Sequence, residues 1–151
     1  LYPPKGLWYD FWTNEDILGA EERWVDVPID STPLFVRAGT ILPLSPVRAN
    51  SSAALSHMEL HAYLSNEQGE GRLYEDAGDG YGDSVKKSFK LTDEKLVQIR
   101  SGDFKPGYSS YRLVVHGAAW KKISIDGGQE IPLRRGEFVE IPESFQEVRF
   151  S

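Results

Sequence analysis

Short runs of alternating apolar and polar residues, interrupted by glycine and proline, constrain the fold of this chain more than any other feature. Successive side chains of a β-strand point to opposite faces, so alternation with a period of two predicts strands that have one buried face. The 151 residues include 14 Gly and 9 Pro, which end most runs after a few residues. About seven or more short strands separated by turns are typical of a β-sandwich. We therefore predict an all-β fold, an antiparallel β-sandwich with almost no helix.

The alternation is most regular in the second part of the chain. The strands expected there cover residues 57–64, 71–75, 85–91, 96–101, 111–116, 121–125, 137–141 and 147–150. In the first of these strands one face is apolar and is expected to be buried; it consists of Met58, Leu60, Ala62 and Leu64. The sequence Asp126-Gly127-Gly128 suits the positive φ angles of a tight hairpin turn.

The first part of the chain is richer in aromatic side chains, and strands are expected at residues 7–12, 22–27, 34–37 and 40–44. A strand over residues 7–12 places Trp8 and Trp12 on one face and Phe11 on the other. Between this part and the next, the composition turns to small and polar residues without periodicity. We predict a partial sandwich domain over residues 1–46, a linker over residues 47–56 and a complete sandwich over residues 57–151.

Composition limits the classes of function. There are 17 Lys and Arg against 23 Asp and Glu, a net charge of −6, which weighs against nucleic acid or an anionic membrane as a partner. No apolar run approaches the roughly 20 residues that a membrane-spanning helix needs. Without cysteine there is no disulfide, thiol nucleophile or cysteine-based metal site. Because the chain opens without Met or a leader pattern, we expect it to be part of a longer protein, whose compartment stays open.

Histidine does not indicate a metal site. His57 and His61 have the spacing of a helical metal pair, but in a strand they lie about 13 Å apart, too far to share one ion. We expect both to face solvent. The sequence offers no partner for His116, and we predict neither a metal nor a cofactor.

An acidic, glycine-rich loop over residues 74–83 is the most conspicuous candidate site. The residues that define it are Tyr74, Asp76, Gly78, Asp79, Gly80 and Tyr81. Counted from Asp76, it lacks the oxygen ligands of an EF-hand, and it lacks the third glycine and the helix of a phosphate-binding loop. We predict a structural turn in which Asp side chains cap backbone amides.

Catalytic chemistry has no support from the residues themselves. No Gly-x-Ser-x-Gly elbow is present, and the 23 acidic residues do not single out a pair for glycoside cleavage. We therefore predict no catalytic residue. The side chains of Trp8 and Trp12 suit a sugar-stacking platform, but buried positions in a core or a domain interface are more common for tryptophan.

Several segments together resemble the C-terminal β-sandwich region of family 31 glycoside hydrolases, the α-glucosidase and α-xylosidase group. Residues 1–13 (Leu-Tyr-Pro-Pro-Lys-Gly-Leu-Trp-Tyr-Asp-Phe-Trp-Thr) and residues 27–43 (Val-Pro-Ile-Asp-Ser-Thr-Pro-Leu-Phe-Val-Arg-Ala-Gly-Thr-Ile-Leu-Pro) carry the resemblance. The loop Leu73-Tyr74-Glu75-Asp76-Ala77-Gly78-Asp79-Gly80-Tyr81 extends it, although the family often has a second Asp where Ala77 stands.

The resemblance implies a role without catalysis. In this family an Asp nucleophile and an Asp acid/base act in a retaining mechanism on a (β/α) barrel that precedes the sandwiches. No segment here matches the family's nucleophile motif, a Trp followed by Asp-Met-Asn-Glu. The resemblance implies that residues 1–46 are the later part of a proximal sandwich and residues 57–151 a distal one. The expected partner is the catalytic barrel of the same parent chain, with Trp8, Phe11, Trp12 and Phe35 packed against it.

Two other functions stay open. The chain could be an independent carbohydrate-binding module that uses Trp8, Trp12, Tyr74 or Tyr81 as a stacking platform. It could also be a protein-interaction domain that uses its aromatic face for another chain.

Overall fold

The computed structural model describes residues 1–50, 53–78, 81–117, 120–134 and 136–151. The predicted all-β sandwich is confirmed: the described residues form strands, turns and loops, without a helix. The strands are β1 (Leu7–Asp10), β2 (Asp16–Leu18), β3 (Phe35–Arg37), β4 (Ile41–Leu44), β5 (His57–Tyr63), β6 (Gly69–Asp76), β7 (Ser84–Leu91), β8 (Lys95–Gly102), β9 (Ser110–His116), β10 (Lys122–Ile125), β11 (Glu130–Pro132), β12 (Phe138–Pro142) and β13 (Glu147–Phe150).

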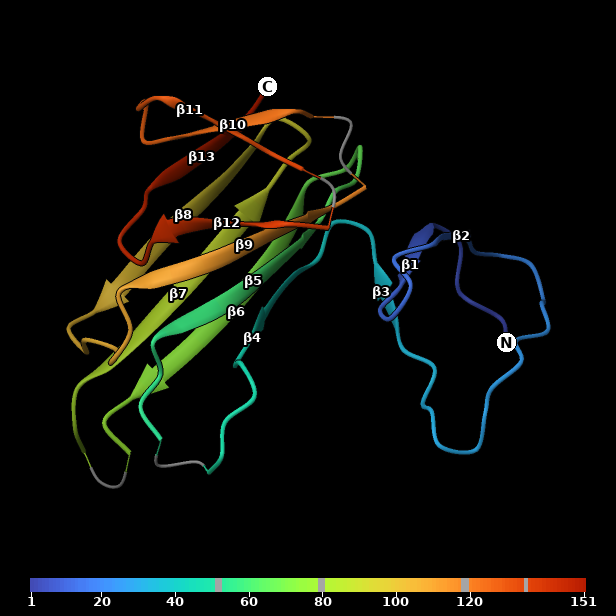
Figure 1. Ribbon diagram of the computed structural model, residues 1–151, viewed down its shortest axis with the longest axis horizontal. Helices are drawn as coiled ribbons and strands as arrows, with labels where there is room; N and C mark the ends of the chain where they lie inside the picture. Colours follow the sequence, from blue (N-terminus) through green and yellow to red (C-terminus); the bar gives the residue numbers. More distant parts are fainter. Residues whose placement is uncertain (51–52, 79–80, 118–119, 135) are drawn as a thin grey trace.

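Two sheets make up the sandwich (Figure 1). One has six strands in the order β11-β10-β13-β8-β7-β6, and the other has four in the order β12-β9-β5-β4. Among the described strands the paired neighbours run antiparallel, except that β5 and β9 run parallel. A parallel pair needs a long crossover, and here the chain between β5 and β9 supplies β6, β7 and β8 of the opposite sheet.

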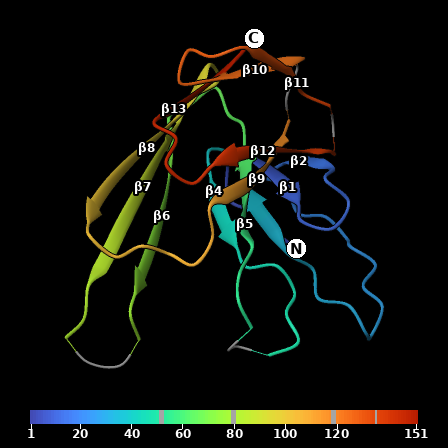
Figure 2. The same ribbon diagram turned by 60° about the vertical axis from the view of Figure 1, so that its left-hand side comes forward.

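The core lies between the two sheets and follows the predicted alternation. Along β7 the inward positions Val85, Phe89 and Leu91 are buried, and along β9 Tyr111 and Leu113 are buried opposite them. The apolar face predicted for β5 is also buried. Figure 2 shows the two sheets from a second direction. The hairpin predicted at Asp126-Gly127-Gly128 joins β10 to β11, with positive φ at its first two residues.

A third, three-stranded sheet lies beside the sandwich, in the order β2-β1-β3 (Figure 1). We refer to residues 1–40, which contain this sheet and its loops, as the N-terminal block. The predicted strand over residues 7–12 is too long, since β1 ends at Asp10. The Asp10 carboxylate accepts hydrogen bonds from the amides of Trp12 and Thr13, both at 2.8 Å, and this cap turns the chain. Trp8 and Trp12 therefore do not share a strand face.

The strand predicted over residues 22–27 is wrong: that segment is irregular. Its contact with the chain start is limited to one residue pair: the Arg23 amide donates to the Leu1 carbonyl and the Leu1 ammonium donates to the Arg23 carbonyl, both at 3.0 Å, which is too little for a ladder. The short strands β2 and β11 were not predicted, since three residues are too few for a recognisable alternation.

The domain boundaries stay a prediction. Strand β4 precedes the predicted linker and pairs with β5 beyond it, with Leu42 opposite His61. The polypeptide from β4 onward therefore contributes to the sandwich, and the N-terminal block precedes β4.

Candidate functional site

The N-terminal block is rich in aromatic side chains. Four of them were predicted to pack against a partner, and the structure places these four in different environments. The Trp8 and Trp12 indoles are each anchored by a hydrogen bond of 2.8 Å, to the carbonyls of Pro4 and Thr32. Phe11 packs edge-on against Trp12, with ring centroids 4.9 Å apart. Phe35 lies in β3 and is half-buried. These contacts hold the rings in place but leave Trp12 exposed.

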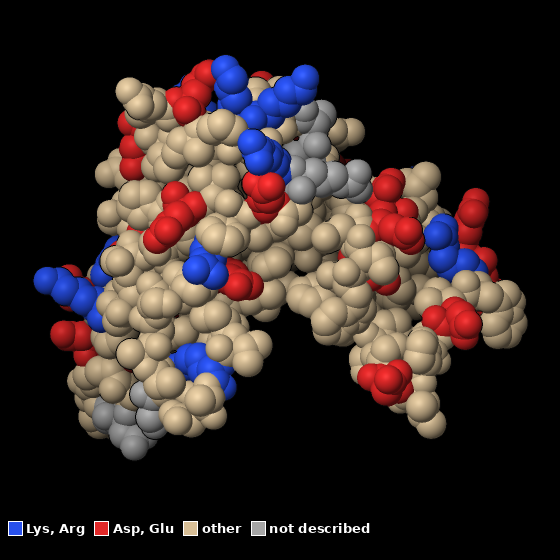
Figure 3. Space-filling model, viewed as in Figure 1, with Lys and Arg blue, Asp and Glu red and all other residues tan. Residues whose placement is uncertain are grey.

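The loops of this block expose more apolar side chains than its sheet can cover. Trp24 and Ile29 are fully exposed, at 102% and 107% of their reference areas. The other exposed large hydrophobic residues of the block are Leu1, Tyr2, Trp12, Leu18, Val25, Val27 and Leu34. Figure 3 shows that acidic side chains are interspersed over the same lobe. We call this set of exposed apolar residues the apolar surface. Exposed apolar side chains of this kind are available for contact with a partner.

The N-terminal block contacts the outer face of the four-stranded sheet through Tyr9. Its hydroxyl donates a hydrogen bond to the Leu64 carbonyl at 3.1 Å, and its ring lies 5.5 Å from that of Tyr63. A Cβ atom at Gly117 would lie 2.1 Å from the Tyr9 hydroxyl, so this close approach needs glycine. Backbone hydrogen bonds between Tyr63 and both Gly39 and Thr40 complete the junction.

Two histidines on the outer face of the four-stranded sheet meet beside this junction. Nδ1 of His61 lies 2.9 Å from Nε2 of His116, and His116 stacks on Tyr63 with ring centroids 4.2 Å apart. His61, predicted to face solvent, is instead partly buried, and it is the partner that the sequence did not supply for His116. Burial, with a further contribution from the nearby His61, lowers the pKa of His116 to about 4. Burial also raises the pKa of the Tyr63 hydroxyl to about 12.

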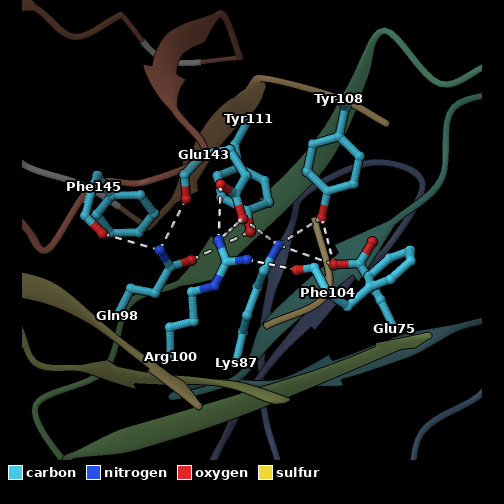
Figure 4. Close-up of polar contacts among 9 residues, drawn as sticks. All are labelled: Glu75, Lys87, Gln98, Arg100, Phe104, Tyr108, Tyr111, Glu143 and Phe145. Atoms are coloured by element: carbon cyan, nitrogen blue, oxygen red, sulfur yellow. Dashed lines mark hydrogen bonds and ion pairs between the residues drawn. The ribbon is translucent and has the colours of Figure 1, made fainter. Parts of the chain in front are cut away.

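A buried ammonium group between the two sheets is the most unusual electrostatic feature of the sandwich. Lys87 is completely buried on the inward face of β7. Its Nζ donates to Glu75 at 2.9 Å and to the Tyr108 hydroxyl at 3.0 Å, and it pairs with Glu143 at 2.6 Å (Figure 4). Three partners satisfy the three donors of an ammonium group. Burial opposes the charge, but the hydrogen bonds that Lys87 donates to Glu143 and Glu75 outweigh it and raise the pKa of Lys87.

Further polar side chains surround this cluster and bind the loop before β13. Arg100 pairs with Glu143 at 3.1 Å and donates to the Phe104 carbonyl at 2.6 Å. The Gln98 amide donates to the carbonyls of Glu143 and Phe145, at 2.9 and 3.0 Å (Figure 4). The carboxylates of Glu75 and Glu143 both pair with cationic side chains of the protein. We interpret the cluster as a structural link between the two sheets. The sequence signal for it was Lys87, a charged residue at an inward position of an otherwise apolar strand face.

The acidic loop is described only in part, because Asp79 and Gly80 lie outside the described residues. The Asp76 carboxylate accepts a hydrogen bond from the Gly78 amide at 3.0 Å, and Gly78 has a φ of +95°. Tyr74 and Tyr81 are exposed at either end of the loop. Its structural role stays a prediction.

The described residues offer neither a cluster of metal-binding side chains nor a membrane-spanning helix. No group of three or more His, Cys, Asp or Glu side chains in those residues lies close enough to hold a metal ion. None of the described segments is a helix of the length and hydrophobicity needed to cross a membrane.

In sequence, this chain is similar to the C-terminal domain of family 31 glycoside hydrolases and to several glycosidases. Residues 1–42 match the model of the glycosyl hydrolase family 31 C-terminal domain. Alpha-glucosidase 2 of Bacillus thermoamyloliquefaciens is 24% identical over 138 residues, covering 85% of this chain. An alpha-xylosidase of Saccharolobus solfataricus is 39% identical over 80 residues, covering 52% of this chain. The chain spans only 18% and 11% of the lengths of these two relatives.

Solved structures of family 31 glycoside hydrolases share the fold of this chain. A family 31 dextranase from Flavobacterium johnsoniae, complexed with glucose, superposes with a TM-score of 0.75 at 20% identity. A family 31 alpha-xylosidase from Xanthomonas citri gives 0.71 at 22% identity. Both superpositions cover 99% of this chain, and 23% and 16% of the respective structures. The predicted resemblance to the C-terminal region of family 31 glycoside hydrolases is therefore confirmed.

Proposed function

We propose that this chain is a noncatalytic C-terminal region of a retaining α-glycosidase of the α-glucosidase type, and that it supports a catalytic (β/α) barrel in the same parent chain. Hydrolysis of O-glycosyl bonds would take place on that barrel. The observation that carries the proposal is the apolar surface of the N-terminal block, which the chain itself leaves uncovered.

The energetics of this surface favour a large protein partner. Burying one large apolar side chain such as Trp24 or Ile29 contributes about 2 kcal/mol, so covering several of them supplies a firm interface. The sheet β2-β1-β3 also has edges at β2 and β3 without a strand neighbour among the described residues, and such edges accept further strands. A barrel that precedes these strands in the parent chain would cover both features.

The experiment is Trp12→Ala in the full-length protein. We expect a lower melting temperature with little change in kcat, because the indole would support the barrel without touching the substrate. The matched control is Tyr81→Ala, which removes a fully exposed aromatic residue from the sandwich and should leave both quantities unchanged. A large loss of kcat at unchanged stability would contradict the proposal. So would hydrolysis of a chromogenic α-glucoside by this chain alone.

A further inference from the structure

Two adjoining hollows lie along the junction between the N-terminal block and the sandwich, and they form one crease. They share the lining residues Leu7, Ser65 and Asn66, and they have volumes of about 390 and 260 Å³. The charged and amide side chains that line the crease are Lys5, Arg37, Asn66, Glu67 and Asp93, and Trp120 lines one of the two hollows. Small-molecule sites commonly occupy roughly 300–1,000 Å³ at the boundary of two structural units.

Four polar side chains of the crease are not engaged with the protein. Within the described part of the chain, the side chains of Asn66, Asp93, Lys5 and Arg37 make no hydrogen bond or ion pair. Together they offer amide, carboxylate, ammonium and guanidinium groups, so the crease presents both donors and acceptors. The Lys87 cluster has the opposite character, since its groups satisfy one another.

An aromatic side chain closes one end of the crease. The Trp120 indole N–H donates to the Asp93 carbonyl at 2.7 Å, which fixes the ring position and leaves its carbon atoms as contact surface. The neighbouring lining residues Tyr9 and Gly117 belong to the tight junction, where the Tyr9 hydroxyl is bonded to the Leu64 carbonyl. These two lining residues are therefore held in place before a ligand binds, which lowers the entropic cost of binding.

The charges of the crease balance. Lys5 and Arg37 contribute two positive charges, and Glu67 and Asp93 contribute two negative ones. An anion or a cation would gain little from this arrangement, whereas an uncharged ligand with many hydroxyl groups can donate to the carboxylate and accept from the cations. A pyranose ring has such hydroxyl groups together with apolar C–H faces that suit an indole.

We propose that the crease binds a neutral saccharide, with Trp120 as its apolar contact and Asn66 and Asp93 as hydrogen-bonding groups. The site is separate from the stacking residues considered from the sequence, which lie on the N-terminal block and the acidic loop. It does not depend on the proposed support of a barrel, because the lining residues all belong to this chain.

The test is a titration of this chain with maltotriose, monitored by backbone amide NMR shifts. We expect saturable shifts centred on Ser65–Glu67 and Asp93, with a dissociation constant of about 1 mM. Trp120→Ala and Asn66→Ala should each weaken binding about fivefold to tenfold, while Trp24→Ala, a tryptophan remote from the crease lining, should bind as the wild type. Added sodium sulfate should compete poorly, because the lining carries no net charge.

Several results would overturn the proposal. They are the absence of shifts up to about 10 mM maltotriose, shifts centred outside the crease, and unchanged affinity in both crease variants. If Trp120→Ala unfolds, the exposed substitution Asn66→Ala and the shift map still decide the question. The failure of the barrel proposal would appear instead in the stability of the full-length protein, so the two failures are distinguishable.

Discussion

The sandwich and the N-terminal block differ in the exposure of their large hydrophobic side chains, which the sandwich buries and the block largely leaves exposed. In the sandwich, the inward residues of both sheets are buried, and even a lysine is enclosed with its partners. In residues 1–40, all of which are described, Tyr9 is the one large hydrophobic residue that is buried, at 5% exposure. The sandwich thus has a complete hydrophobic core, whereas the N-terminal block has no comparable core of its own.

This difference separates residues that maintain the fold from residues available for interaction. A sheet of three strands, each only three or four residues long, has too little area to bury its own loops. The fully exposed side chains of Trp24 and Ile29 contribute little to the stability of this chain. Substitutions in the two regions should consequently differ in size and in the property that they affect.

The largest effect is expected from Lys87→Met. This change leaves the Glu75 and Glu143 carboxylates in the sandwich without their shared cation, and breaking a buried ion pair in this way costs about 3–5 kcal/mol. Chemical denaturation of the purified chain measures the loss. Lys86→Met is the matched control, since Lys86 is exposed on the other face of β7 and its replacement should change stability by about 0.5 kcal/mol or less. Equal stability of the two variants would show that the cluster does not hold the sheets together.

The sandwich was largely predictable from the sequence for a physical reason. Strands such as β7 and β9 alternate cleanly because one face meets a core and the other meets water, and this period is visible without coordinates. The parallel pairing of β5 and β9 was not predictable, since alternation specifies faces and not neighbours. The end of β1 was missed because the Asp10 carboxylate captures two amides, a local contact that overrides the aromatic pattern.

The candidate sites were less predictable because they depend on residues far apart in the chain. His61 and His116 are 55 positions apart and meet through the register of β5 and β9. The Lys87 cluster similarly joins Glu75 and Glu143 from distant segments. The crease requires the segments at Leu7, Asn66 and Trp120 to converge, and no spacing in the sequence indicates this. What the sequence did indicate was the aromatic character of the N-terminal block.

A smaller effect, dependent on pH, is expected from the histidine beside the junction. The unfolded chain binds a proton at His116 below about pH 6.5, whereas the buried imidazole binds it only near pH 4. The free energy of unfolding should therefore fall as the pH falls through this window, by up to about 1.4 kcal/mol per pH unit from this group. His116→Phe should remove that part of the slope. Denaturation curves at several pH values compare the variant with the wild type, and parallel pH profiles would contradict the burial of a neutral His116.

The smallest effect concerns how firmly the N-terminal block is attached, and two tyrosines form a matched pair for measuring it. Tyr9→Phe removes the hydroxyl that binds the Leu64 carbonyl and should cost about 1 kcal/mol. The hydroxyl of Tyr63 is buried without a hydrogen-bond partner among the described residues, so Tyr63→Phe should be neutral or slightly stabilising.

Hydrogen exchange distinguishes a local effect from a global one. In Tyr9→Phe, amides of β1 and β3 should exchange faster while those of β7 and β9 keep their protection, because the sandwich core does not include the junction. Faster exchange in all four strands would mean that the block and the sandwich unfold as one unit. The two regions would then differ in how much hydrophobic surface they expose, but not in the free energy at which they unfold.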